Sequence, residues 1–402
     1  MKPLRYSITA LVLVLAACGN GQSADSAPAT DGDSPATTQG SATDGEPILI
    51  GHPGDFSDIY SFYDSPVRAG AELAVEEINA AGGVLGRPLE YRALDGRNDQ
   101  DETLRRTQEL IDAGAVYLIG TTGDPFLAQA TLACQAGIPI STGDGTAPTL
   151  VGDAGECAFH TIMSDNLQGA VAAEYALAQG YETAYLLRST EIPYTNDLPS
   201  YFAEAFTNGG GEIIGEDEYR IDAGDYNVQV TNIAALDPAP DVIYTPMFIP
   251  DTPVFMRQLR AAGIDIPVIT GDGSVDASLL EAGDAVEGIV ATTHAWPAEG
   301  NAVAEFFAQF EEATGSTPDS VVAGIGYDEI YLIKAAIEAA GSAEPDAIMG
   351  ALPGLSFEGV TGSLTINPGT RRADKEVTLV EVVEGEIQFL DQFVPSFVPE
   401  VG

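Results

Sequence analysis

The sequence predicts an α/β protein of two lobes, each built on a doubly wound parallel sheet with helices on both faces. From residue 47 onwards, short apolar runs alternate with helical patterns, which is typical of parallel strands buried on both faces. The alternation starts again after the segment FHTIMSD, at residues 159–165. A chain of 402 residues also exceeds the size at which a single hydrophobic core stops growing. We therefore expect two successive lobes with a cleft between them.

The first lobe is expected to begin with a strand at 47–51 and a helix at 65–83. In this helix Ser65 is the expected N-cap, Pro66 takes the first helical position and Gly82 marks the exit. The remaining pattern predicts strands at 89–95, 116–120 and 138–142, and helices at 101–114 and 125–137.

The second lobe is expected to repeat this alternation. The pattern predicts helices at 166–180, 197–210, 228–236 and 252–263, and strands at 183–189, 212–219, 241–246, 267–272 and 288–296. Two further helices, at 305–315 and 326–341, would return to the first lobe. The segments 362–367 and 376–391 alternate in the manner of antiparallel strands.

The N-terminal segment has the features of a bacterial export signal. Two basic residues, an apolar run and small residues predict a signal peptide over residues 1–18. The segment Leu15-Ala16-Ala17-Cys18 resembles the lipobox of bacterial lipoproteins, in which the cysteine is lipidated; the alternative is an ordinary cleaved signal. Residues 19–46 have no apolar periodicity and predict a disordered linker. We expect a body outside the cytoplasm, attached to the membrane by a lipid alone.

Charge and motif content exclude several classes of function. The formal net charge of −45 leaves no basic surface for nucleic acid. The sequence has no Ser-His-Asp, Cys-His, P-loop or HExxH arrangement, so we expect no enzyme and no cofactor. His52, His160 and His294 are too scattered to predict a metal site. Cys134 and Cys157 are expected either to form a disulfide or to be two buried thiols.

Two segments resemble a known family. GAELAVEEINAAGG at 70–83 and FMRQLRAAGI at 255–264 are similar to type I periplasmic substrate-binding proteins of ABC importers, in particular those for branched-chain amino acids. The resemblance implies two lobes joined by three crossovers, with residues 47–163 and 296–358 in the first and 164–295 and 359–402 in the second.

The resemblance also implies a function in solute binding. A monomer would capture an amino acid or a related small amine or amide by lobe closure and deliver it to permease subunits. The alternative is a sensory binding protein that signals to a membrane receptor.

The binding positions of the family can be carried over one by one. The loop that holds the ligand carboxylate in amino-acid binders matches Thr121, Thr122, Gly123 and Asp124. The next binding loop of the family matches Asp144, Gly145 and Thr146. The acid that takes the ligand ammonium matches Asp272. The aromatic positions match Tyr63, Tyr194 and Phe248, and Trp296 is a candidate for a wall of the cleft.

Several of these residues have a plain structural alternative. Asp124 and Thr146 are also expected as helix caps, Asp272 as a turn residue, and Trp296 as hinge packing. No serine stands at the carboxylate position, where Gly123 is found, and Asp144 departs from the family pattern. If two of the three acids face the ligand, a lone carboxylate is repelled and an amine, an amide or a second cationic group is favoured.

Overall fold

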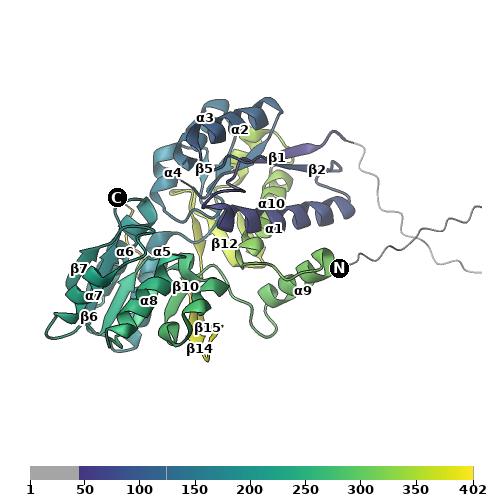
Figure 1. Cartoon of the computed structure of the whole chain (residues 1–402). Helices are drawn as coiled ribbons and strands as arrows, with labels where there is room; N and C mark the ends of the chain where they lie inside the picture. Colours follow the sequence, from purple (N-terminus) through teal and green to yellow (C-terminus); the bar gives the residue numbers. More distant parts are fainter. Residues whose placement is uncertain (1–44, 124, 402) are drawn as a thin grey trace, which may run out of the picture. The chain divides into compact units, whose positions relative to one another are not determined.

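The computed structural model describes residues 45–123 and 125–401. A parallel sheet and a second, mainly parallel sheet dominate the described chain (Figure 1). The predicted signal peptide, Cys18 and most of the predicted linker lie outside the described residues, as does Asp124. Among the helices described, none is long and apolar enough to cross a membrane.

The first sheet is wholly parallel, with the strand order β2-β1-β3-β4-β5. Its strands are β1 (Ile48–His52), β2 (Leu89–Ala93), β3 (Tyr117–Ile119), β4 (Ile140–Ser141) and β5 (Ala158–Phe159). The early helices are α1 (Ser61–Ala80), α2 (Gln100–Asp112), α3 (Phe126–Ala136) and α4 (Thr149–Ala154). The later helices α9 (Ala302–Thr314), α10 (Val322–Ala340) and α11 (Pro345–Ala351) return to this part, as expected from the sequence. We call this part the first lobe.

The second sheet has the strand order β15-β14-β10-β9-β8-β6-β7. Its strands are β6 (Thr183–Arg188), β7 (Glu212–Glu218), β8 (Val242–Thr245), β9 (Val268–Thr270), β10 (Val290–Thr293), β14 (Val377–Val383) and β15 (Glu386–Phe393). The helices are α5 (Asp165–Ala178), α6 (Pro193–Asn208), α7 (Asn227–Ala234) and α8 (Asp251–Ala261), with 3-10 helices η1 (Asp272–Ser274) and η2 (Ala277–Val286). We call this part the second lobe.

The two lobes repeat one topology. In chain order, β6 to β10 occupy the same places in the second sheet as β1 to β5 occupy in the first. The order reverses beside β1 and beside β6, and ligands of open α/β sheets bind at such points, beyond the carboxyl ends of the strands. The final strands β14 and β15 extend the second sheet in antiparallel fashion, as their alternating sequence predicts.

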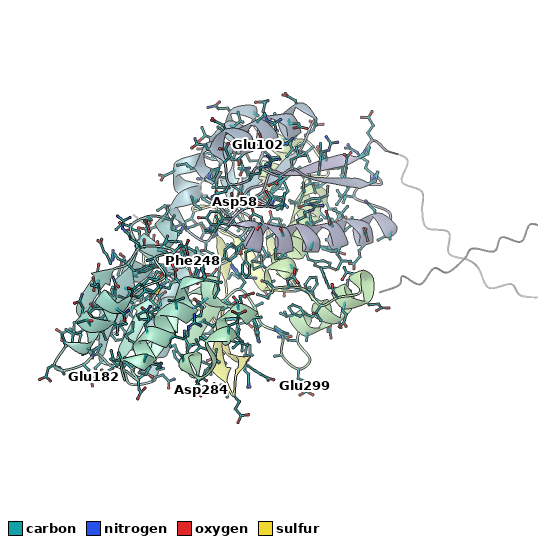
Figure 2. The ribbon with its side chains drawn as sticks, viewed as in Figure 1. Asp58, Glu102, Glu182, Phe248, Asp284 and Glu299 are labelled. Atoms are coloured by element: carbon teal, nitrogen blue, oxygen red, sulfur yellow. A yellow bond between two sulfur atoms is a disulfide. The ribbon has the colours of Figure 1, made fainter. Side chains whose placement is uncertain are left out.

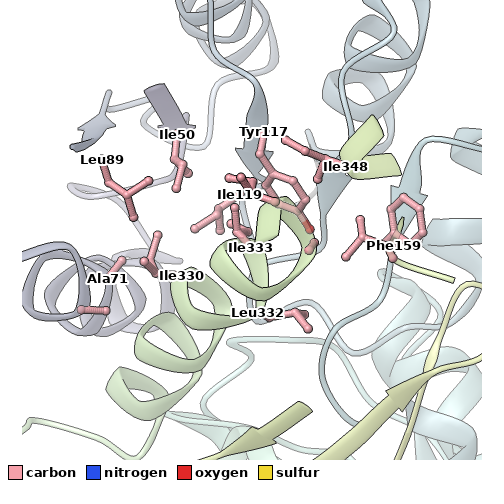
Figure 3. Packing of buried hydrophobic residues seen from close by; sticks show 14 of the residues in the cluster. Ile50, Ala71, Leu89, Tyr117, Ile119, Phe159, Ile330, Leu332, Ile333 and Ile348 are labelled. Carbon is pink, nitrogen blue, oxygen red and sulfur yellow. The ribbon is translucent and has the colours of Figure 1, made fainter. Parts of the chain in front are cut away.

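Large apolar side chains fill the first lobe. Tyr117 and Ile119 of β3 pack against Ile330 and Ile333 of α10, all fully buried (Figure 3). Helix α10 also lies along α1, and Gly70 of α1 and Gly326 of α10 allow the two helix backbones to approach closely. A Cβ on Gly70 would lie 1.7 Å from the carbonyl oxygen of Ala323. The two helices therefore pack backbone to backbone at this point.

One lobe boundary predicted from the sequence needs correction. The strands β11 (Ser356–Gly359), β12 (Gly362–Ile366) and β13 (Ala373–Lys375) form a separate antiparallel sheet. Leu364, Ile366 and Ala373 are buried in the same cluster as β1 and α10. Residues 362–373 therefore belong to the first lobe, and the chain returns to the second lobe near β14 instead of at residue 359.

The start of α1 also differs from the prediction. The helix begins at Ser61, so Ser65 is not its cap and Pro66 lies inside it. The Asp55 carboxylate organises the preceding loop, because it accepts hydrogen bonds from the backbone N–H groups of Asp58 and Tyr60 at 2.8 and 3.0 Å. This support of the loop by a residue several positions upstream of the helix has no local sequence signature.

The structure joins Cys134 and Cys157 by a disulfide, with their Cα atoms 5.3 Å apart. Cys134 lies in the last turn of α3 and Cys157 directly precedes β5. The bond therefore ties a covering helix to the edge strand of the first sheet.

Candidate ligand site

A cavity of about 220 Å³ lies where loops of the two lobes meet. Nine of the residues predicted from the sequence line it: Tyr63, Thr122, Gly123, Asp144, Gly145, Thr146, Tyr194, Phe248 and Asp272. Most lie on loops that follow β3, β4, β8 and β9, and Tyr63 and Tyr194 lie near the first turns of α1 and α6. Phe248 is labelled on the second lobe in Figure 2.

Sequence reasoning missed most of the apolar wall. Further lining residues are Tyr60, Leu127, Ala147, Leu150, Ile192, Pro193 and Gly273. Leu127 lies in the first turn of α3 and Leu150 in that of α4, so both follow the predicted loops directly. Their positions directly after these loops could have identified them as lining residues. Together with the edge-on pair of Tyr194 and Phe248, whose ring centroids are 6.4 Å apart, they make the cavity largely apolar.

The loop after β3 is held by a buried carboxylate that the sequence did not point to. Asp64 accepts the backbone N–H of Thr122 at 2.9 Å and the Thr121 hydroxyl at 2.7 Å. The N–H of Thr121 donates to Gln129 at 3.0 Å, and the N–H of Gly123 donates to the Thr121 hydroxyl at 3.2 Å. Thr121 is therefore a support of the loop and does not line the cavity.

This arrangement limits what the loop can bind. The backbone N–H groups of residues 121–123 already donate to acceptors of the protein. Burial raises the pKa of Asp64 to about 6, against the opposing effect of its hydrogen bonds. At neutral pH its negative charge stands behind the loop, which disfavours an anionic ligand group there.

Trp296 does not form a wall of the cavity. Its indole N–H donates to the carbonyl oxygen of Ile387 at 3.1 Å, and its ring packs against Val275, Ala291 and Val380. The residue therefore belongs to the packing of the second lobe, where it follows β10 and packs near β14 and β15, which continue the same sheet. Asp124 lies outside the described residues, so its predicted roles remain predictions.

On the second lobe, Asp272 is fixed by its neighbours. The Tyr194 hydroxyl donates to Oδ1 of Asp272 at 3.1 Å and accepts the backbone N–H of Gly273 at 3.3 Å. The Asp272 N–H lies 3.3 Å from Oε1 of Gln168, which also accepts the Thr292 hydroxyl at 2.7 Å. The Tyr63 hydroxyl of the first lobe reaches the Gly273 carbonyl oxygen at 3.4 Å.

His294 is the main residue that sequence reasoning missed. It directly follows β10, and its Nε2 lies 3.1 Å from Oδ1 of Asp144 and 3.2 Å from Oδ2 of Asp272. The side chain therefore joins an acid of each lobe. Burial acts to lower the pKa of His294, but the two carboxylates outweigh it and raise the pKa to about 9. The position of His294 in the sequence could have identified it, because β9 and β10 are adjacent parallel strands, so the residues after both strands lie at the same edge of the sheet.

The raised pKa of His294 makes stability depend on pH. A histidine charged more readily in the folded state stabilises it fully below the unfolded value of 6.5, and this contribution is lost as pH rises through about 9. Between about pH 6 and pH 10, we expect wild type to lose on the order of 3 kcal/mol more unfolding free energy than His294→Gln.

Urea unfolding at several pH values measures this difference. His52→Gln is the matched control above about pH 7.5, because burial lowers the pKa of His52 to about 3 in the folded state and an unfolded histidine is also mostly neutral there. Parallel pH profiles of wild type and His294→Gln would contradict the ionic contact.

The arrangement has the features of a small-molecule binding site. It combines a largely apolar cavity with a few converging polar groups, two of which are carboxylates. Within the described residues, no group of three or more histidine, cysteine, aspartate or glutamate side chains is placed to hold a metal ion.

Comparison with known proteins agrees with this geometry. A family model described as periplasmic binding protein matches residues 47–386. A leucine-, isoleucine-, valine-, threonine- and alanine-binding protein of Pseudomonas aeruginosa is 24% identical over 307 residues, covering 75% of this chain and 81% of the relative.

Two solved structures show the same fold. A leucine-binding protein of Thermotoga maritima has a TM-score of 0.77 and 26% identity, covering 87% of this chain and 99% of its own. A solute-binding protein of an ABC transporter from Rhodopseudomonas palustris, in complex with 3,4-dihydroxybenzoic acid, has a TM-score of 0.76 and 26% identity, covering 88% and 98%.

Proposed function

The chain belongs to the periplasmic binding protein family, and we propose that it captures a small amine-bearing solute by lobe closure and delivers it to the permease of an ABC importer. The comparisons confirm the family and the two-lobed fold that the sequence predicts. The matching proteins are binding proteins and not enzymes. Capture between two lobes is the action for which this hinge architecture is suited.

The proposal places the body outside the cytoplasm, as a monomer attached by a lipid on Cys18. The support is the sequence alone: the lipobox-like Leu15 to Cys18 and the Gly- and Ser-rich residues 19–46, which are long enough to serve as a tether. Mass spectrometry of the mature N-terminus tests the lipid directly.

The acids that line the cavity carry the proposal for the solute. Asp144 of the first lobe and Asp272 of the second are its acidic lining residues, and among the described lining residues none is lysine or arginine. Carboxylates attract a positively charged group, while Tyr194, Phe248 and Leu150 offer apolar contact to the rest of the molecule.

The named ligands of the relatives differ from the solute proposed for this chain. The relatives are said to bind leucine and other amino acids, or a dihydroxybenzoic acid, all of which carry a carboxylate. In this chain the loop N–H groups at 121–123 are engaged by Asp64, Gln129 and Thr121. A solute without a carboxylate therefore fits this site better than a solute whose binding requires its carboxylate to be held by these N–H groups.

Calorimetry with three matched probes tests the proposal. Leucine, isoamylamine and isovalerate share one branched alkyl group and differ in carrying both charged groups, the amine alone or the carboxylate alone. We expect isoamylamine to bind and isovalerate not to bind. Tight binding of leucine with no response to isoamylamine would contradict an amine-selective site.

A further inference from the structure

We propose that His294 sets the number of positive charges that the solute must carry, and that the native site takes a solute with a single net positive charge. The inference rests on the proposed function, because it concerns how the same cavity selects among amines. In this inference His294 determines specificity through its charge, without touching the solute.

The geometry places one cation of the protein between two of its anions. The His294 imidazole lies within 3.1 and 3.2 Å of a carboxylate oxygen of Asp144 and Asp272, respectively. His294 is 1% exposed and Asp144 is 6% exposed. Neither ring nitrogen has a partner with hydrogen-bond geometry in the described chain, and Oδ1 of Asp144 has none either. Charge therefore holds the three groups together.

A charge count follows from this cluster. Burial raises the pKa of Asp144, and the adjacent His294 imidazole opposes that rise. With both carboxylates ionised and the imidazole protonated, the cluster keeps one negative charge that the protein does not neutralise. A solute with one positive charge completes the balance. A neutral solute, or a zwitterion such as leucine, leaves one buried charge uncompensated, and a solute with two positive charges leaves an excess of the opposite sign. Each imbalance is costly because the charged groups of the cluster are buried.

The other titratable groups around the cluster do not alter the count near neutral pH. Burial raises the pKa of Tyr63 and Tyr194 well above the usual range, so both phenols are uncharged, and it raises the pKa of Asp165 likewise, which favours the protonated form of that carboxyl. Burial lowers the pKa of His160 to about 4, which leaves it neutral. Asp64 lies behind the loop, where its carboxylate accepts hydrogen bonds from Asp55, Thr121 and Thr122, and it does not line the cavity, so it is not part of this cluster.

The test compares two amines of equal length. n-Pentylamine carries one positive charge and 1,5-diaminopentane carries two. Calorimetry at neutral pH gives the ratio of their dissociation constants for wild type, for His294→Gln and for the control His52→Gln. We expect wild type and the control to prefer n-pentylamine. In His294→Gln the ratio should shift toward 1,5-diaminopentane by about tenfold or more, because a second uncompensated carboxylate is present.

A second measurement needs no variant. Raising the pH from about 7 to about 9.5 removes most of the His294 proton, n-pentylamine stays largely charged, and the dissociation constant of 1,5-diaminopentane is corrected for its own partial loss of one proton. Wild type should then shift in the same direction as His294→Gln does at neutral pH.

The outcomes separate this inference from the proposed function. If wild type binds these amines but the ratio changes neither with His294→Gln nor with pH, the amine site stands and the role of His294 is wrong. If wild type binds neither amine, both are overturned. A shift in His52→Gln equal to that in His294→Gln would also overturn the inference, because the effect would then not come from the cluster.

Discussion

Replacement of Asp272 by asparagine is expected to weaken the binding of isoamylamine by about 100-fold. The substitution keeps the size of the side chain and one oxygen, so the Tyr194 hydroxyl retains an acceptor. It removes one of the two carboxylates of the cavity and leaves Asp144 paired with His294, with no net charge for the solute amine. Calorimetric titration of the variant measures the loss.

Asp284→Asn is the matched control for this change. Asp284 lies exposed on η2 of the same lobe, away from the cavity, and its replacement should leave the dissociation constant unchanged. A loss of less than about threefold in Asp272→Asn would mean that its carboxylate does not hold the solute.

Replacement of Gly70 by alanine is expected to have the largest effect on stability. The added Cβ would lie 1.7 Å from the carbonyl oxygen of Ala323, which belongs to backbone and cannot swing away. Helices α1 and α10 would have to separate, which opens the core cluster of the first lobe. We expect a loss of about 3 kcal/mol or more in the free energy of unfolding, measured in urea.

Gly350→Ala serves as its control. Gly350 is also helical, but no heavy atom lies within 4 Å of the added Cβ. Alanine should therefore stabilise α11 by about 0.5–1 kcal/mol through its helix propensity. Equal effects of the two substitutions would contradict the close packing of α1 on α10.

The sequence predicted the sheets well because buried parallel strands leave a readable pattern. The runs that became β1, β3, β6 and β8 are apolar and flanked by amphipathic helices, so their order alone fixed the two-lobed fold. The short helices α4 and α11, of six and seven residues, were missed. Such segments are too short to show a period.

The site was predictable only where family position carried the information. Nine lining residues were carried over from family positions, most of which lie on loops that follow parallel strands and meet at one edge. His294 and Asp64 were missed, because their roles arise from contacts over distances of 150 and 58 residues with Asp144 and Thr122. The apolar positions of β12 showed that it buries one face but could not show against which lobe, and this led to the wrong boundary.

A crystal structure of the protein with isoamylamine tests the central claim most directly. The account predicts one amine in the cavity, with its nitrogen within hydrogen-bond distance of a carboxylate oxygen of Asp144 or Asp272 and its alkyl group against Tyr194 and Phe248. An amine bound elsewhere on the protein, with the cavity left empty, would contradict it.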